Sequence, residues 1–375
     1  MRDNKNILLI LLVLSFLLSL LTIFVVAEGG IPSVSAKSST LYEPTTNDFL
    51  LEKNADLRLP MASTTKIMTA LIAIEKCDLN EEVIIPKEAT GIEGSSIYMK
   101  EGDRISVKDL IYSVLLQSAN DAATALAIKI GGDVKGFADI MNEYASKLGL
   151  KNTRFQNPHG LDEKDHYTTA RDLALLASAA LKNDAFKAIC STYKHTFMLS
   201  DSPRVIFNHN KLLKRYDGAI GVKTGFTDES GRCLVSAAER NGICLIAVTM
   251  NAPDDWNDHT KMLNFGFDNY EAIPMTDLCQ SDFIIPIKNG TANTVKATVK
   301  DAQQTLVHRK GEAPLAAKTT LIDGVNAPVE IGDKLGEIKF YRGNELALTL
   351  DIVSEESVAQ IKKNKNLFDF LKELF

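Results

Sequence analysis

The pattern of apolar residues along positions 60–270 predicts a region of helices followed by strands. Helical spacing occurs in five stretches: 60–75, 107–130, 134–148, 169–183 and 256–270. Strand-like segments occur at 220–225, 233–238 and 243–250. The second helical stretch is interrupted near 118–120, and Asn241-Gly242 predicts a two-residue turn between the last two strands. These elements together predict a mixed α/β (α+β) domain.

The pattern of apolar and polar residues changes after position 273. Short alternating segments, such as 294–299, 336–341 and 346–352, are separated by Gly, Asn and Asp turns. This pattern predicts a small all-β domain over 273–354.

The last residues, 355–375, form a different pattern. At 100° per residue, one half of a helical wheel carries Leu367, Phe368, Phe370, Leu371, Leu374 and Phe375. An aromatic-rich apolar face beside lysines is typical of a helix that lies in the headgroup plane of a membrane. The alternative is a terminal helix docked on its own domain.

The first residues, 1–36, have the features of a signal peptide. Arg2 and Lys5 precede an uncharged, Leu-rich run over 7–27, and the small-residue stretch ending at Ala36 suits signal peptidase. The apolar run is also long enough for an uncleaved anchor. Either way we expect a chain exported across the cytoplasmic membrane, secreted and then attached peripherally to its outer face.

Composition excludes some classes of protein. The 375-residue chain has a formal charge of −6, so no surplus of Lys and Arg is available for nucleic acid. Five scattered cysteines without a C-x-x-C pair predict neither a disulfide framework nor structural zinc. We expect no metal and no cofactor.

Three short motifs follow one another along the chain: Ser63-Thr64-Thr65-Lys66, Ser118-Ala119-Asn120 and Lys223-Thr224-Gly225. None is specific alone, because Ser191-Thr192-Tyr193-Lys194 and Lys318-Thr319-Thr320 are near matches elsewhere in the chain. Context separates them. The first motif opens a predicted helix, the second interrupts one, and the third lies on a predicted strand.

The first motif can form a nucleophile and its base. Lys66 lies one helical turn after Ser63, so its amine can reach the serine hydroxyl. A lysine serves as base only where burial and nearby positive charge lower its pKa, and Lys223 could supply that charge. Thr224 and Lys223 offer a hydroxyl and a cation for a carboxylate. The absence of a side chain at Gly225 would let a substrate backbone lie alongside.

The ordered triple resembles the signature of the penicillin-recognising serine enzymes, here with alanine inside the second motif. With its flanking sequences, 60–69, 117–122, 159–162 and 223–228, it is similar to low-molecular-mass D-alanyl-D-alanine carboxypeptidases, penicillin-binding proteins of the peptidase S11 type. The resemblance covers about residues 38–375. It implies a β-lactamase/D,D-peptidase-like catalytic domain over 37–272, with a central antiparallel sheet flanked by helices, followed by the β-domain and amphipathic helix.

The resemblance also implies an activity and its catalytic residues. The terminal D-alanine of peptidoglycan pentapeptide stems would be removed through an acyl-enzyme on Ser63, which β-lactams would also acylate. Lys66 would be the base, and Ser118 would shuttle protons.

Substrate contacts follow from the same resemblance. Asn120 would help to hold the substrate, while Lys223 and Thr224 would bind its terminal carboxylate beside Gly225. The oxyanion would be held by backbone N–H groups, one of them from Phe226.

Two other functions remain open at this point. A serine β-lactamase is disfavoured by the extra β-domain and terminal helix. A catalytically idle β-lactam sensor or wall-binding module has no chemical need for the intact set Ser63, Lys66, Ser118 and Lys223.

Other conspicuous residues have ordinary structural interpretations. One loop holds potential metal ligands, His159, Asp162, Asp165 and His166, but their spacing favours hydrogen bonds that shape the loop. We expect Trp256 in the core and Asp254-Asp255 in a solvated turn.

Overall fold

The computed structural model describes residues 30–274, 282–300, 305–312 and 315–361. The chain divides into two compact units, 1–33 and 34–375, and every element below belongs to the second. The predicted signal segment 1–36 and the predicted terminal helix fall largely outside the described residues. Within the described ranges, no helix combines the length and apolar character needed to cross a bilayer.

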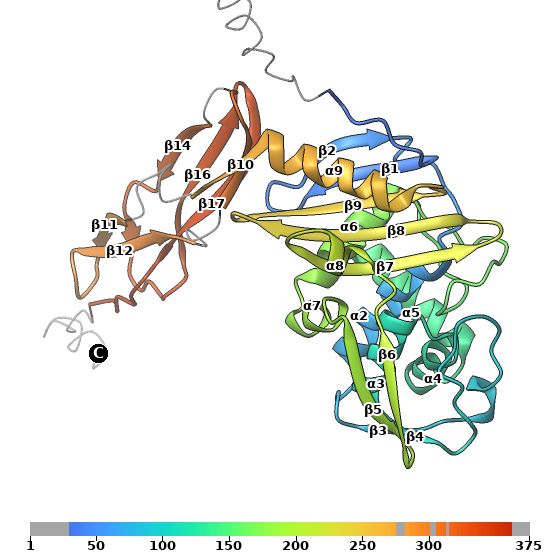
Figure 1. The fold of residues 1–375 in the computed structure, drawn as a ribbon. Coiled ribbons are helices and arrows are strands. Elements are labelled where there is room, and N and C mark those ends of the chain that lie inside the picture. Colours follow the sequence, from blue (N-terminus) through green and yellow to red (C-terminus); the bar gives the residue numbers. More distant parts are fainter. Residues whose placement is uncertain (1–29, 275–281, 301–304, 313–314, 362–375) are drawn as a thin grey trace, which may run out of the picture. The chain divides into compact units, whose positions relative to one another are not determined.

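A five-stranded antiparallel sheet forms the centre of the catalytic region, in the order β2-β1-β9-β8-β7 (Figure 1). Its strands are β1 (Ser38–Glu43), β2 (Asp48–Lys53), β7 (Ala219–Thr227), β8 (Gly231–Arg240) and β9 (Ile243–Met250). Alternation along β8 sends Leu234 and Val235 into separate apolar clusters on the two faces. Helix α9 (Asp255–Asn269) contributes Met262 and Leu263 to the cluster that contains Leu234.

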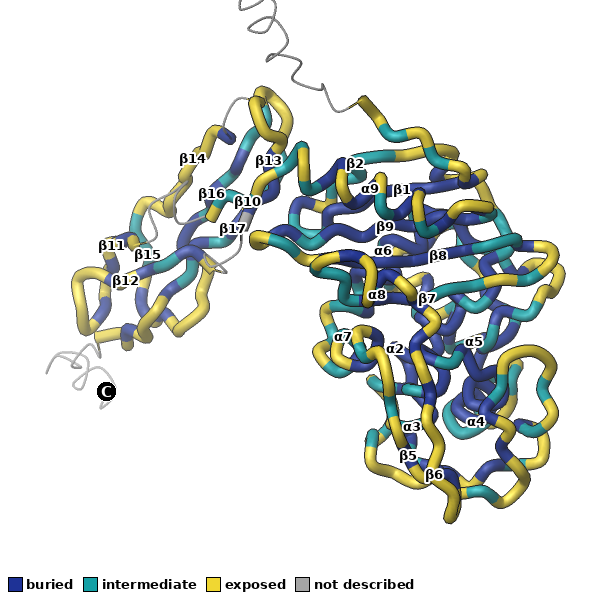
Figure 2. Tube along the Cα trace, in the orientation of Figure 1, coloured by how far each residue is buried: buried dark blue, intermediate teal, exposed yellow. Residues whose placement is uncertain are grey.

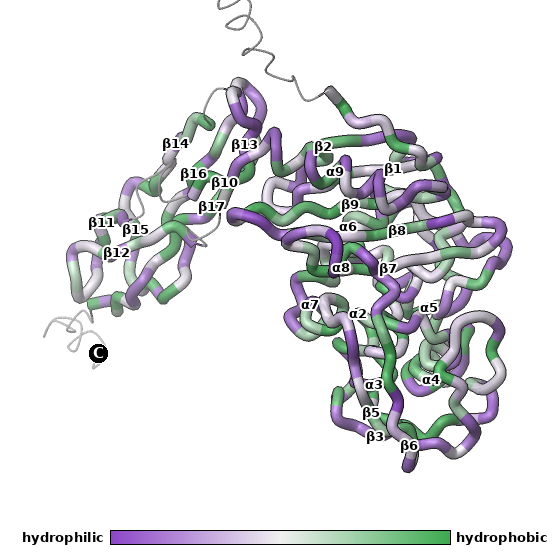
Figure 3. The backbone as a smooth tube through the Cα atoms, viewed as in Figure 1, coloured by the Kyte–Doolittle hydropathy of each residue, from purple (hydrophilic) through white to green (hydrophobic). Residues whose placement is uncertain are grey.

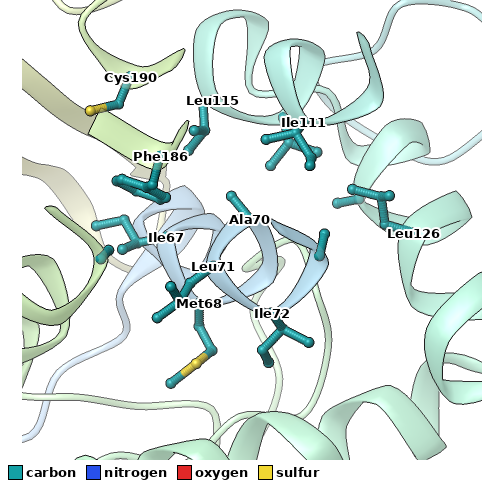
Figure 4. Close-up of a cluster of buried hydrophobic side chains, with 14 of the residues drawn as sticks. Ile67, Met68, Ala70, Leu71, Ile72, Ile111, Leu115, Leu126, Phe186 and Cys190 are labelled. Atoms are coloured by element: carbon teal, nitrogen blue, oxygen red, sulfur yellow. The ribbon is translucent and has the colours of Figure 1, made fainter. Parts of the chain in front are cut away.

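The other cluster joins the sheet to the helices predicted from the sequence and to one short helix, 184–190, that was not predicted. They are α2 (Lys66–Lys76), α3 (Val107–Tyr112), α4 (Asn120–Gly131), α5 (Val134–Lys147), α6 (Ala170–Leu181) and α7 (Asp184–Cys190). Helix α2 lies at their centre: side chains from several elements, including Ile111, Leu126 and Phe186, surround its apolar residues (Figure 4). Burial on most sides therefore fixes the helix that follows Ser63.

Smaller elements complete the catalytic region. They are η2 (Ala62–Thr65), β3 (Glu82–Ile84), η3 (Lys87–Ala89), β4 (Arg104–Ser106), the π-helical turn η4 (Ser113–Gln117), β5 (Lys194–Leu199), β6 (Ser202–Phe207) and α8 (Leu212–Arg215). The antiparallel hairpin β5–β6 is mostly exposed, whereas the middle of the central sheet is buried (Figure 2).

Strand β1 was not anticipated from the sequence. Its polar sequence SSTLYE is buried throughout. Ser38 and Thr40 donate hydrogen bonds to backbone carbonyls of neighbouring residues, and Glu43 accepts from the backbone N–H groups of Thr45 and Thr46. The side chains of Ser38, Thr40 and Glu43 therefore have hydrogen-bond partners, which makes their burial tolerable.

The C-terminal region is all-β, as predicted. Its strands are β10 (Tyr270–Pro274), β11 (Asp282–Lys288), β12 (Thr294–Val299), β13 (Thr305–Arg309), β14 (Ala316–Leu321), β15 (Val325–Asn326), β16 (Lys334–Arg342) and β17 (Glu345–Ser354). Strand β11 alternates between exposed and buried positions, and its buried residues join an apolar cluster of their own. Hydrophobic and hydrophilic residues both occur along the strands of this region (Figure 3).

Two predicted boundaries need correction. Strand β10 spans position 272, where the catalytic domain was expected to end. The amphipathic helix cannot begin at 355, because Val358 bridges Val329 and is buried in the β-domain cluster. The apolar face over 367–375 lies outside the described residues.

The predicted two-residue turn between the last two central strands is confirmed, because β8 ends at Arg240 and β9 begins at Ile243. Cys244 lies opposite Glu239, on either side of the turn at Asn241 and Gly242. Leu234 pairs with Thr249, a register that keeps the thiols of Cys233 and Cys244 apart.

Candidate active site

The candidate nucleophile lies on a short 3-10 turn, η2, that runs directly into α2. Lys66 begins the helix, and its Nζ lies 2.9 Å from Ser63 Oγ. This is the one-turn relationship that the motif spacing predicted.

The amine of Lys66 is enclosed by protein. The residue is 0% exposed, and its Nζ also donates to Asn120 Oδ1 and to the His159 carbonyl, each at 2.6 Å. Burial lowers the pKa of Lys66 well below its usual value, the positive charge of Lys223 lowers it further, and Asp121 opposes the shift. A neutral amine next to a serine hydroxyl can accept its proton.

Asn120 positions this lysine. Its Nδ2 donates to the Glu93 carbonyl at 2.5 Å, while its Oδ1 accepts from Lys66. Its backbone N–H donates to Ser95 at 2.7 Å. Because both ends of the amide are engaged within the protein, the predicted contact of Asn120 with substrate stays a prediction.

Ser118 lies where the predicted helix is interrupted. The π-helical turn η4 ends there, Ser118 adopts the left-handed conformation with φ 62°, and α4 starts two residues later. A non-glycine residue held at positive φ is strained, and such strain is characteristic of functional sites. The break directs Ser118 to the cavity that Ser63 also lines.

The third motif lies on β7, one of the two edge strands of the central sheet within the described residues. Lys223 is 1% exposed, and its Nζ donates to the Thr224 carbonyl at 2.9 Å. Burial lowers the pKa of Lys223 to about 7.

Gly225 packs closely against the turn that carries Ser63. A Cβ at this position would lie 3.1 Å from the Ser63 nitrogen and 3.1 Å from Ala62 Cβ. The missing side chain therefore makes room for the turn that carries Ser63, and the predicted approach of a substrate backbone to Gly225 stays a prediction.

The loop over 156–167 supports the same turn. The Gln156 N–H donates to His166 Nδ1, so the neutral ring carries its proton on Nε2, which lies 2.8 Å from Thr65 Oγ1. That hydroxyl donates in turn to the Ala62 carbonyl. Burial lowers the pKa of His166 to about 4, which keeps the ring neutral. The loop histidines thus make the hydrogen bonds that the sequence analysis favoured over metal ligation.

A cavity of about 340 Å³ opens in front of Ser63. Five predicted site residues line it, namely Ser63, Ser118, Thr224, Gly225 and Phe226. The other three, Lys66, Asn120 and Lys223, lie buried behind them. The exposed ring of Phe226 stands at the rim, 62% exposed.

The cavity also contains residues that the sequence analysis did not assign to it: Ser95, His209, Lys211, Arg232, Asp255 and Trp256. Two expectations are corrected here. Asp255 is buried and not a solvated turn residue, because it accepts a hydrogen bond from Arg232 at 3.0 Å. Trp256 packs only partly against the core and also faces the cavity.

One of these residues could have been found from the sequence. With β7 and β8 joined by a short turn, Arg232 falls opposite Phe226 in the register. No comparable signal marks His209 or Lys211, which come from the loop after β6.

The near-match motifs do not form sites. Ser191 follows the end of α7 and Lys194 begins β5, so no helical turn brings the two side chains together. Lys318-Thr319-Thr320 lies on the exposed strand β14.

Comparisons with known proteins identify relatives of both the catalytic region and the β-domain. The family model described as D-alanyl-D-alanine carboxypeptidase matches residues 26–254, and the model of the penicillin-binding protein 5 C-terminal domain matches 276–360. The chain is 33% identical to the D-alanyl-D-alanine carboxypeptidase DacF of Bacillus subtilis, covering 90% of this chain and 88% of that protein. It is also 33% identical to DacC of Escherichia coli, covering 92% and 89%.

A solved structure of penicillin-binding protein 5 from Haemophilus influenzae matches with a TM-score of 0.72 and 28% identity, over 88% of this chain and 99% of that one. The agreement extends over both the catalytic region and the β-domain. It favours the carboxypeptidase over the β-lactamase and the idle sensor. The chain belongs to the D-alanyl-D-alanine carboxypeptidase family of serine-type penicillin-binding hydrolases.

Proposed function

We propose that Ser63 is the residue acylated when this carboxypeptidase removes the terminal D-alanine of a peptidoglycan stem, with Lys66 as its base. One observation supports this above all: Ser63 Oγ, which lines the cavity, lies 2.9 Å from a fully buried amine. Burial and the charge of Lys223 both favour the neutral form of that amine.

The proposed reaction has two steps. Ser63 Oγ attacks the carbonyl carbon of the penultimate D-alanine while its proton passes to Lys66. The C–N bond then breaks, and the leaving amine takes a proton through Ser118. Water next attacks the ester, which releases the shortened peptide and restores the Ser63 hydroxyl.

Backbone donors complete the proposed site. The N–H of Ser63 at the start of the turn and the N–H of Phe226 on the edge strand would hold the oxyanion. An edge strand also offers backbone groups to an extended peptide, which suits β7 for binding a stem peptide alongside Thr224.

Penicillin labelling tests the nucleophile. Intact-mass measurement after labelling should show one covalent adduct, and peptide mapping should place it on Ser63. Ser63→Ala should abolish both the adduct and D-alanine release, while the matched variant Ser191→Ala in the near-match motif should keep both. An adduct on Ser191 would contradict the assignment of Ser63 as the nucleophile.

We further propose that residues 361–375 hold the exported protein on the outer face of the cytoplasmic membrane. A 15-residue helix is about 22 Å long, too short for a hydrocarbon core of about 30 Å, so it would lie flat. Four lysines against two acids give the segment a charge of +2, which favours anionic lipid.

Vesicle binding tests the anchor. Deleting 361–375 from a protein that lacks 1–36 should abolish binding to anionic vesicles and leave hydrolysis of a soluble pentapeptide unchanged. If the truncated protein binds vesicles as well as its parent, the terminal segment is not the anchor.

A further inference from the structure

The third motif suggests Lys223 as the cation that binds the substrate carboxylate, but this side chain does not face the cavity. Lys223 is buried, hydrogen bonded to a backbone carbonyl, and absent from the described residues that line the cavity. Its charge acts on Lys66 from behind the cavity wall. Lys211 and Arg232, in contrast, line the cavity.

Arg232 is well placed beside the third motif. It pairs with Phe226 across β7 and β8, and cross-strand partners carry their side chains on the same face. Strand alternation puts Thr224 on that face too, as the diagonal neighbour of Arg232. Diagonal neighbours lie within reach of a long side chain. The Thr224 hydroxyl and the guanidinium thus border the same part of the cavity.

The guanidinium is held from one side. Its Nη2 donates to Asp255 Oδ2 at 3.0 Å, and the Asp255 side chain is only 4% exposed. Asp255 also accepts from the Trp256 backbone N–H at 2.9 Å, which fixes the carboxylate at the start of α9. The Arg232 side chain itself is 42% exposed. One edge of the planar group is therefore engaged, while a large part of the side chain remains accessible.

The ring of Trp256 restricts the position of the Arg232 guanidinium on a second side. Its ring centroid lies 5.9 Å from Arg232 Cζ, within the range of a cation–π contact. Lys211 Nζ lies 5.8 Å from the same ring, but Lys211 is exposed and no carboxylate holds its amine among the described contacts. Of the two cations at the cavity, Arg232 is the preorganised one.

We propose that Arg232, oriented by Asp255 and Trp256, receives the terminal carboxylate of the substrate together with the Thr224 hydroxyl. A guanidinium can bind a carboxylate through two parallel hydrogen bonds, which fixes direction as well as charge. This recognition makes Arg232 a specificity residue for substrates that end in a free carboxylate. The inference rests on the proposed acylation of Ser63.

Two substrates and one variant test the role. The first substrate is a peptide ending in D-Ala-D-Ala with a free carboxylate, and the second is an acyl thioester whose leaving group carries no carboxylate. Arg232→Gln should lower kcat/KM for the peptide roughly 10- to 100-fold, as expected for loss of a hydrogen bond to a charged group. It should leave turnover of the thioester unchanged.

Controls separate a specific contact from a structural effect. Arg104→Gln removes an exposed arginine from its ion pair with Glu82, away from the cavity, and should change neither substrate. Asp255→Asn should reduce the preference for the free carboxylate without slowing thioester turnover. Equal losses for both substrates in Arg232→Gln would show a merely structural role. A selective loss in Lys211→Gln but not in Arg232→Gln would assign the carboxylate to Lys211.

The pH dependence provides an independent check. The ratio of kcat/KM for the acid to that for its C-terminal amide should persist to about pH 9, because a guanidinium stays charged there. If Lys223 alone bound the carboxylate, the ratio would fall as pH rises through its pKa of about 7. Failure of the proposed acylation would look different, since the wild-type protein would then form no Ser63 adduct with either substrate.

Discussion

Replacing Gly160 by alanine should disturb the catalytic turn from a distance. Gly160 has φ +87°, and an added Cβ would lie 1.9 Å from the Ala62 carbonyl oxygen and 2.8 Å from Thr65 Oγ1. The first contact is with backbone, which cannot swing away as a flexible side chain can. The turn that carries Ser63 must therefore shift, or the loop must withdraw the His159 carbonyl from Lys66.

The cost can be divided into two parts. A left-handed conformation costs a non-glycine residue about 1–2 kcal/mol. Forcing an extra carbon into a packed region costs about 1–3 kcal/mol. Gly160→Ala should therefore lower the free energy of unfolding by about 2–5 kcal/mol, out of a total of about 5–15 for a typical protein.

Gly102 offers a matched control. It has φ +83° and no atom within 4 Å of an added Cβ, so Gly102→Ala carries the conformational cost alone. The effect of alanine on the unfolded chain is common to both variants and cancels in the comparison. Urea denaturation should show a difference of about 1–3 kcal/mol between the two variants.

The rate of penicillin acylation should also fall more in Gly160→Ala than in Gly102→Ala. A misplacement of about 1 Å can cost about 100-fold in rate, so Gly160→Ala should slow penicillin acylation roughly 10- to 100-fold. Gly102→Ala should acylate at the wild-type rate. Equal stabilities and equal acylation rates for the two variants would refute the reasoning.

Two further predictions concern pH. Lys223→Met removes a positive charge that lowers the pKa of Lys66, so the acid limb of the acylation rate should move to higher pH; an unmoved limb in stopped-flow labelling would contradict the coupling. Burial lowers the pKa of His166 to about 4 and that of His259 to about 3 in the folded protein. Below pH 6.5 the unfolded chain therefore binds more protons at these two histidines than the folded protein does. Stability should therefore fall from pH 6.5 towards 4, by up to about 1.4 kcal/mol per pH unit for each histidine, and His166→Gln should reduce that slope in urea titrations.

Hydrophobic periodicity predicted most of the helices and the central strands, because the helices carry apolar residues at helical spacing and the central strands β8 and β9 are short apolar runs buried on both faces. The same periodicity could not find β1. Ser38, Ser39 and Thr40 look like a solvated lead, yet the strand pairs with β9 from the far end of the catalytic region. Long-range pairing supplies the partners that make buried hydroxyl groups tolerable, and no local pattern records it.

The sequence alone identified the candidate nucleophile, its helical partner and the strand that carries the third motif, since spacing along one helix or one strand sets which side chains are neighbours. Tertiary structure decided what those groups can do. The packing of the fold buries both Lys66 and Lys223, and this burial lowers the pKa of each amine. The fold also brought Arg232, Asp255 and Trp256 to the cavity from two elements. Burial and charge proximity depend on which surfaces meet in three dimensions, and that information is not contained in any short stretch of the chain.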